Sequence, residues 1–153
     1  MIRHRRHAGF TLIEVLLVVV ITAVLAGAII PRFLGTADDA KTSSLKHNLH
    51  VMEAQLEIYR AQHLNRYPTI QDNALPQFIG ATNTAGEIGQ SGPKYPFGPY
   101  VIEAPMNPFD GSKAVTAVAV PGQKPSGVVN ALGGWQFDES TGAFWPNHAE
   151  YYK

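Results

Sequence analysis

The stretch that decides the fold runs from Gly9 to Ile30 and reads GFTLIEVLLVVVITAVLAGAII. After Gly9 it holds 21 residues with a single charge, on Glu14. As an α-helix these residues would be about 31 Å long, close to the roughly 30 Å hydrocarbon core of a bilayer. Its 14 Leu, Ile, Val or Phe residues favour insertion by roughly −4 to −8 kcal/mol, against about +3 kcal/mol for one central acid. We therefore predict a membrane-spanning helix over residues 10–30.

The flanking charges predict the orientation of this helix. A short basic leader, residues 1–9, carries Arg3, Arg5 and Arg6, whereas only Arg32 follows the apolar run closely. Because basic flanks stay on the cytoplasmic side, we expect the leader in the cytoplasm and the C-terminal part on the opposite side of the membrane. The protein would then cross that membrane once.

Residues 31–66 continue the helix in amphipathic form. Six residues spaced 4, 3, 4, 3 and 4 apart make one apolar stripe: Leu45, Leu49, Met52, Leu56, Tyr59 and His63. Arg66-Tyr67-Pro68 should end the helix, since the residue before proline is pushed out of the α region. Three apolar heptads are too few for a separate coiled coil, so the C-terminal domain should cover this stripe.

Residues 67–153 have the composition of a turn-rich head. Ten of the 11 prolines and 11 of the 14 glycines follow residue 66, so elements here should be short. We predict one or two helical turns over 72–78, an ordered loop over 92–110 and a strand over 114–120. Trp135–Phe137 and Ala143–Trp145, with Gly142 at the turn, predict a hairpin. The fold class is α+β: a long N-terminal helix packed by a small C-terminal antiparallel sheet and loops.

Several functions are excluded by composition. The chain has no cysteine, which removes disulfides, thiol catalysis and cysteine-based zinc sites. Its 12 basic and 12 acidic residues balance, so nucleic acid is not an expected partner. No phosphate-binding loop or nucleophile elbow occurs, and we do not expect an enzyme.

The junction Gly9-Phe10-Thr11-Leu12-Ile13-Glu14 resembles the processing site of type IV pilin-like proteins, the prepilins and the type II secretion pseudopilins. The resemblance implies that a prepilin peptidase cuts after Gly9 and methylates Phe10. It also implies that Glu14, an acid in hydrocarbon, pairs with the Phe10 amine of a neighbouring subunit. Pro31 fits the family because it removes one helix hydrogen bond and lets the helix bend or loosen.

Four downstream segments are similar to the major, G-type pseudopilin of type II secretion systems: Tyr67–Thr69, Gly98–Tyr100, Asn107–Gly111 and Gly134–Trp135. This similarity implies a homopolymer, the pseudopilus, which helps to export folded proteins. The expected partners are an inner-membrane assembly platform and minor pseudopilins. Energy would come from a cytoplasmic ATPase.

Calcium is a further expectation from the resemblance, because major pseudopilins bind it through acidic residues of their C-terminal loops. In this chain Asp110, Asp138 and Glu139 are the candidate oxygen donors, although their spacing matches no known calcium loop. Asp138 and Glu139 fit equally well as hairpin-turn residues. Otherwise no cofactor is expected.

Two alternative functions remain open at this point. The chain could be a major or minor subunit of a type IV pilus, serving adhesion, motility or DNA uptake. The absence of cysteine favours the pseudopilin, because long adhesive pili commonly carry a C-terminal disulfide loop. A protein of another class is also possible, since Ala26-Gly27-Ala28 has the form of a signal peptidase site. Cleavage after Ala28 would release a soluble binding module.

Overall fold

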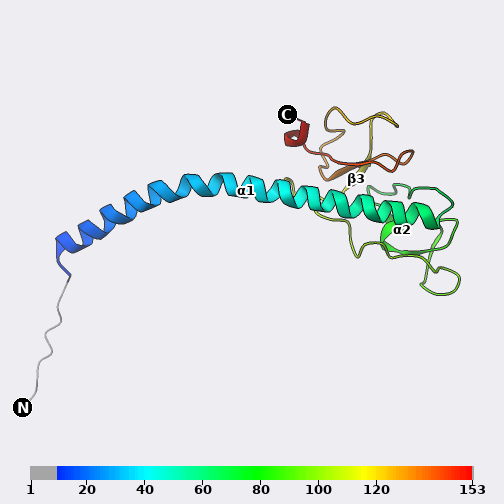
Figure 1. Cartoon of the computed structure of the whole chain (residues 1–153), viewed down its shortest axis with the longest axis horizontal. Coiled ribbons are helices and arrows are strands. Elements are labelled where there is room, and N and C mark those ends of the chain that lie inside the picture. The colour runs from blue at the N-terminus through cyan, green and yellow to red at the C-terminus, as the bar shows by residue number, and fades with distance from the viewer. Residues whose placement is uncertain (1–9, 153) are drawn as a thin grey trace, which may run out of the picture. The chain divides into compact units, whose positions relative to one another are not determined.

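The computed structural model describes residues 10–152, with the side chains of residues 30–35 left out. The basic leader, including Gly9, lies outside the described residues. The chain divides into two compact units, Met1–Ala40 and Lys41–Lys153. One long helix, α1 (Leu12–Gln62), passes from the first unit into the second (Figure 1).

In the first unit, α1 opens with the apolar run. Leu12–Ile29 is long and apolar enough to cross a membrane by length and composition, and none of these 18 residues is buried inside the protein. A core helix of a soluble protein would bury most of such a segment, so this explanation does not apply. The backbone stays helical through Pro31.

In the second unit, the amphipathic stripe of α1 is buried, as predicted. Leu45, Met52, Leu56 and Tyr59 expose 4% or less of their surface, and Leu49 is partly buried. The helix ends at Gln62, four residues earlier than the sequence predicts. Because Leu64 and Asn65 have left-handed φ angles of 55° and 64°, the α-helix cannot continue through them.

The C-terminal sheet contains three strands, β3 (Val115–Ala117), β4 (Trp135–Phe137) and β5 (Phe144–Pro146). The β4–β5 hairpin pairs antiparallel with Phe137 opposite Phe144, which confirms the predicted hairpin. However, β3 pairs with β4 in parallel, so the sheet is mixed rather than antiparallel throughout. The sequence could not reveal this, because strand direction depends on the path of the connecting segment.

Strand β3 is also shorter than the predicted range 114–120. The chain leaves the sheet after Val118, whose amide still donates to the carbonyl of Phe137. Pro121 has no amide hydrogen, and Gly122 turns the chain with a φ angle of 79°. The 17 residues from Val118 to Gly134 then form the crossover between the parallel strands.

Smaller elements make the other end of this unit. The helix α2 (Pro76–Ile79) covers only three of the seven residues in the predicted helical range 72–78, because Asp72 and Asn73 adopt left-handed φ angles. The strands β1 (Ala81–Thr82) and β2 (Ile88–Gly89) pair antiparallel. A short 3-10 helix, η1 (Ala149–Tyr152), follows β5.

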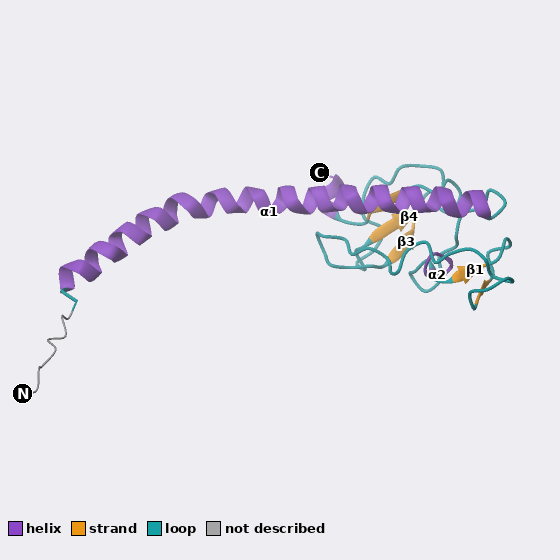
Figure 2. Cartoon of the chain, turned by 60° about the horizontal axis from the view of Figure 1, so that its bottom comes forward, coloured by secondary structure: helices purple, strands orange, loops and turns teal. Residues whose placement is uncertain are grey.

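The core of the second unit lies between the apolar stripe of α1 and one face of the mixed sheet. Figure 2 shows β3 and β4 of this sheet beside the C-terminal half of α1. Trp135, Phe137 and Phe144 supply the sheet's aromatic part, with Trp135 and Phe144 stacked at 5.2 Å between ring centres. The Trp135 Nε1 donates to the carbonyl oxygen of Pro105 at 2.8 Å. Core aromatic residues thus anchor the proline-rich loop 92–110.

Candidate functional site

The first turn of α1 is a capping box made by Thr11 and Glu14. The Thr11 hydroxyl accepts a hydrogen bond from the Glu14 amide at 3.3 Å. In return, the Glu14 carboxylate accepts from the Thr11 amide at 2.7 Å and from the Thr11 hydroxyl at 2.6 Å. This reciprocal pattern satisfies amides that a helix start leaves without partners. Glu14 is therefore a structural residue of the helix start.

Among residues 10–152, the Glu14 carboxylate receives hydrogen bonds on one of its two oxygens. Both hydrogen bonds from Thr11 end on Oε2, and the residue is exposed. Phe10 exposes 87% of its surface. A shallow apolar groove of about 230 Å³ runs past Glu14, between Phe10 and Val18. The arrangement presents a negatively charged oxygen within an apolar surface, where a cation could meet it.

Two other predicted assembly and processing residues are only partly described. Gly9 lies outside the described residues, so its placement cannot be compared with the prediction. Pro31 lies within continuous helix, and its side chain is not described. The loosening expected at Pro31 stays a prediction.

Asp138, a calcium candidate, is buried and holds two loops together. Its Oδ1 accepts from the amide and the hydroxyl of Ser140, and its Oδ2 accepts from the amide of Gly122. Although burial raises the pKa of the Asp138 carboxyl, the hydrogen bonds from Ser140, Gly122 and Thr141 outweigh it and lower the pKa to about 2. The carboxylate is thus bound by groups of its own chain.

The other two calcium candidates hold loops as well. Asp110 accepts from the amides of Ser112 and Gly134, and Glu139 accepts from the amide of Ile70. Gly134 and Asp138 flank the two ends of β4, roughly 13 Å apart at strand spacing. The structure therefore does not bring the three carboxylates together. Among residues 10–152, no group of three or more His, Asp or Glu is placed to hold a metal ion.

The sequence analysis missed the role of Thr11. The signal was present, because Thr11-Leu12-Ile13-Glu14 has the T-x-x-E form of a capping box before an apolar run. It also missed Gln136, a buried polar residue on the side of β4 opposite Trp135 and Phe137. Alternation along the strand could have placed Gln136 on that face, but it could not have predicted that Gln136 is buried.

Comparison with known proteins supports the resemblance of the N-terminal junction to a methylation motif. Residues 4–30 match the family model of the prokaryotic N-terminal methylation motif. The chain is 30% identical over 105 residues to type II secretion system core protein G of Klebsiella pneumoniae, covering 69% of this chain and 71% of the relative. It belongs to the family of type II secretion system core protein G.

Other core protein G relatives match a larger share of the chain. The protein of Vibrio cholerae is 29% identical over 141 residues, 91% of this chain and 90% of its own. That of Klebsiella michiganensis is 27% identical over 121 residues, 79% of this chain and 81% of its own. No solved structure gives a significant match. The resemblance drawn from the junction and the downstream segments is confirmed, and the fold is the expected α+β arrangement.

Proposed function

We propose that this chain is a structural subunit of a type II secretion pseudopilus, cut between Gly9 and Phe10, methylated on Phe10 and polymerised into a filament that helps to export proteins. The observation that supports it best is the exposed apolar helix of Leu12–Ile29 with one acid in its first turn. A helix that buries no residue within its own chain needs lipid or other copies around it. The core protein G relatives are named as components of the type II secretion system.

Before assembly, the protein would sit in the bacterial inner membrane with its N-terminus in the cytoplasm and its head in the periplasm. The arginines of the leader support this orientation. Cutting on the cytoplasmic side leaves the whole apolar helix as an anchor. A prepilin peptidase would make the cut, and an inner-membrane platform with minor pseudopilins would receive the subunit.

Assembly would use the free oxygen of Glu14. Cleavage after Gly9 creates a positively charged amine on Phe10, and Glu14 Oε1 of an adjacent subunit would bind it. In an apolar surrounding such a pair is attractive, because each charge alone would cost far more free energy. The pair would set the axial register of the filament.

The first test identifies the mature N-terminus by mass spectrometry of protein purified from membranes. We expect methylated Phe10 as the first residue. A chain starting at Ile29 would instead support the exported module, and a chain that keeps residues 1–9 would contradict processing altogether.

The second test asks whether assembly needs the charge of Glu14 and not only its hydrogen bond to Thr11. Glu14→Gln keeps an acceptor for the Thr11 amide but removes the charge, whereas Glu14→Ala removes both. We expect both variants to be processed at Gly9 and neither to assemble. The readout is the amount of sheared filament recovered by sedimentation. If Glu14→Gln assembles like the unmodified chain, the charge pairing is refuted.

A further inference from the structure

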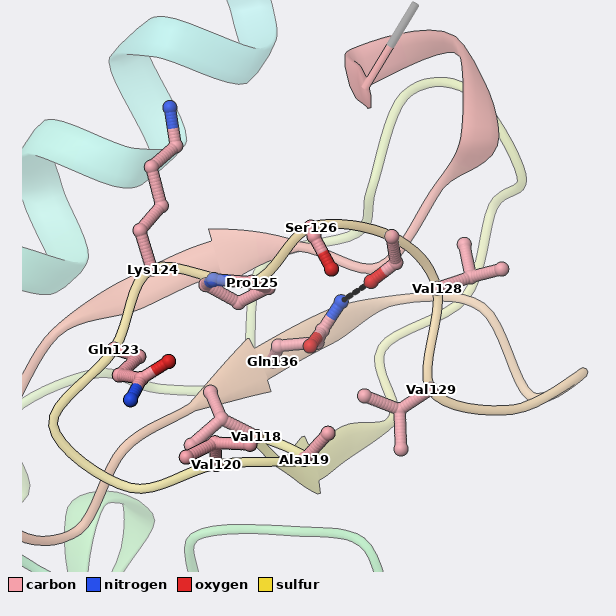
Figure 3. Close-up of a pocket in the computed structure, with 11 residues that line it drawn as sticks. Val118, Ala119, Val120, Gln123, Lys124, Pro125, Ser126, Val128, Val129 and Gln136 are labelled. Carbon is pink, nitrogen blue, oxygen red and sulfur yellow. Dashed lines mark hydrogen bonds between the residues drawn. The ribbon is translucent and has the colours of Figure 1, made fainter.

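The valine-lined pocket beneath the crossover 118–134 is used within its own unit (Figure 3). Its volume is about 240 Å³, and it lies between the crossover and β4. The Nε2 of Gln136 donates to the carbonyl oxygen of Gly127 at 2.8 Å, which ties the crossover to the strand. Lys124 points away from the pocket and lies over the Tyr151 ring at 5.8 Å. Gln136 and Lys124 therefore bind groups of the same unit.

A second apolar surface lies on α1, on the side away from the buried stripe. In the second unit, six residues spaced 3, 4, 3, 4 and 3 apart form this outer face: Ser44, His47, Val51, Ala54, Ile58 and Ala61. All six are exposed, with Val51 at 36% and Ile58 at 45%. At 3.6 residues per turn, the centre of the outer face lies about 150° around the helix from the centre of the buried stripe.

The outer face carries no Asp, Glu, Lys or Arg. The five charged residues of α1 after residue 40 project about 90° or more from its centre: Lys41, Lys46, Glu53, Glu57 and Arg60. On a surface helix the side opposite the core is ordinarily charged or polar. In α1 the charges stand on the flanks instead, and Val51 and Ile58 occupy the side opposite the core. This reversal indicates that an apolar partner covers the outer face.

The first unit contains a segment that matches this face in polarity and in length. Leu12–Ile29 is a helical stretch of 18 residues, none of them buried, and its single charge is on Glu14. The outer face from Ser44 to Ala61 also spans 18 residues, so each stretch covers about 27 Å of helix axis. Within one chain the two stretches belong to the same continuous helix, so the outer face can receive this segment only from another copy.

We propose that the outer face of α1 in one copy packs against the Leu12–Ile29 segment of a second copy after that segment has left the bilayer. The inference rests on the proposed function, because it names a contact within the proposed polymer. The contacting surfaces are different parts of the chain, so the contact is heterologous and repeats from copy to copy, as in an open helical filament. With Ser44 beside Leu12, parallel copies are offset by about 32 residues of helix, or roughly 48 Å.

A charge placed on the outer face tests whether the face is covered. Ala54→Glu sets a carboxylate without a partner against the apolar segment of the other copy, so we expect a loss of sheared filament of about tenfold or more. Thr42→Glu is the matched control, because Thr42 is exposed on the same helix about 120° away, and it should leave the yield unchanged.

Two further measurements isolate the effect of the charge. Ala54→Ser changes the side chain without adding charge, and it should assemble like the natural chain. Because residue 54 is exposed, thermal unfolding of the second unit should be the same in all three variants. Normal assembly of Ala54→Glu would refute the contact.

Cysteine cross-linking identifies what covers the face, since the natural chain has no cysteine. A full-length Val51→Cys chain is co-expressed with chains that carry one cysteine at each position from 12 to 29 in turn, and sheared filaments are oxidised. Disulfides form only where Cα atoms come within about 7 Å, so we expect linked dimers from at least one position. Thr42→Cys with the same series is the control and should give none.

The outcomes separate the contact from the function beneath it. Filaments in which no position of the series links to Val51→Cys would overturn the contact but leave the pseudopilus intact. Links only between two Val51→Cys chains, or an adduct with a different protein, would show another partner and would also overturn it. If the natural chain forms no filaments, the proposed function fails, and the contact fails with it.

Discussion

The two units of this chain treat apolar residues in opposite ways. In Leu12–Ile29 none of the 18 residues is buried, whereas in the second unit Trp135, Phe137 and Leu56 are almost fully enclosed. The second unit alternates apolar and polar positions, so one face of each element can close on another. The Leu12–Ile29 segment of α1 is apolar on nearly all sides, and none of its residues is buried by the described part of the chain. Apolar content alone therefore does not create a core.

The two acids Glu14 and Asp138 show the same contrast. Asp138 uses both oxygens within its own chain, one for Ser140 and one for Gly122. Glu14 places both of its hydrogen bonds on Oε2. Asp138 thus joins parts of the fold through both oxygens, whereas within residues 10–152 only one oxygen of Glu14 receives hydrogen bonds.

The largest expected effect on the free energy of unfolding comes from truncating a buried side chain in the second unit. Trp135→Ala should lower the free energy of unfolding by about 3–5 kcal/mol, because it leaves a cavity and removes the hydrogen bond to Pro105. Leu16→Ala, in the exposed helix, should change it by less than about 0.5 kcal/mol. Urea unfolding of the detergent-solubilised full chain, followed by tryptophan fluorescence for Leu16→Ala and by circular dichroism for both, measures the difference. Similar losses from both variants would break the contrast.

A pair of glycines sharpens the description of the enclosed unit. Gly142 and Gly122 both have left-handed φ angles, but only at Gly142 would a Cβ collide with a neighbour, the Tyr67 ring. We expect Gly142→Ala to cost about 2–4 kcal/mol and Gly122→Ala about 1–2 kcal/mol. Thermal unfolding of the two variants tests this order. Equal costs would mean that the hairpin does not pack against Tyr67.

Asp138 predicts a pH dependence for the enclosed unit. Its pKa is about 2 in the folded protein and 3.8 ordinarily, so its carboxylate stabilises the fold above about pH 4 and loses this effect as the pH falls toward 2. Asp138→Asn should lower the free energy of unfolding by about 1.5–3 kcal/mol at neutral pH. Denaturation curves from pH 7 to 2 should converge for the two proteins at the acid end. A constant gap would contradict the role of the charge.

The smallest effect is expected at the helix start. Thr11→Val removes the cap and should weaken the first turn of α1 by about 1 kcal/mol, without changing the second unit. Hydrogen exchange in detergent micelles should be faster at the amide of Val15, which donates to the Thr11 carbonyl. Thr11→Ser, which keeps the hydroxyl, is the control and should exchange like the natural chain.

The sequence predicted the features that depend on local periodicity. The apolar residues from Leu45 to Tyr59 repeat at helical spacing, so their burial could be predicted. The aromatic residues of β4 and β5 lie on either side of a turn with Gly142, so the pairing of these strands could be predicted as well. The end of α1 was misplaced, because the rule for residues before proline acts at Tyr67 whereas left-handed Leu64 and Asn65 end the helix first.

Long-range features could not be predicted in this way. The parallel pairing of β3 with β4 depends on how the crossover returns to the sheet, and no local pattern encodes that path. The calcium candidates were chosen by residue type, and the structure places Asp110 and Asp138 at opposite ends of one strand. Glu14 stood out in the sequence as a lone charge in an apolar run, and the structure places it in the capping box of α1, whereas its role in assembly stays a prediction.

The bond between Thr11 and Glu14 has a consequence for the time a subunit spends alone. A carboxylate without hydrogen bonds in the hydrocarbon core of a bilayer would favour expulsion of the helix start or pairing with a cation. The Thr11 hydroxyl and amide already donate hydrogen bonds to this carboxylate, which in the proposed membrane-bound state would lower the cost of holding an unassembled subunit in lipid. In the proposed assembly, the remaining negative charge would attract the Phe10 amine of another subunit at the growing end of the filament.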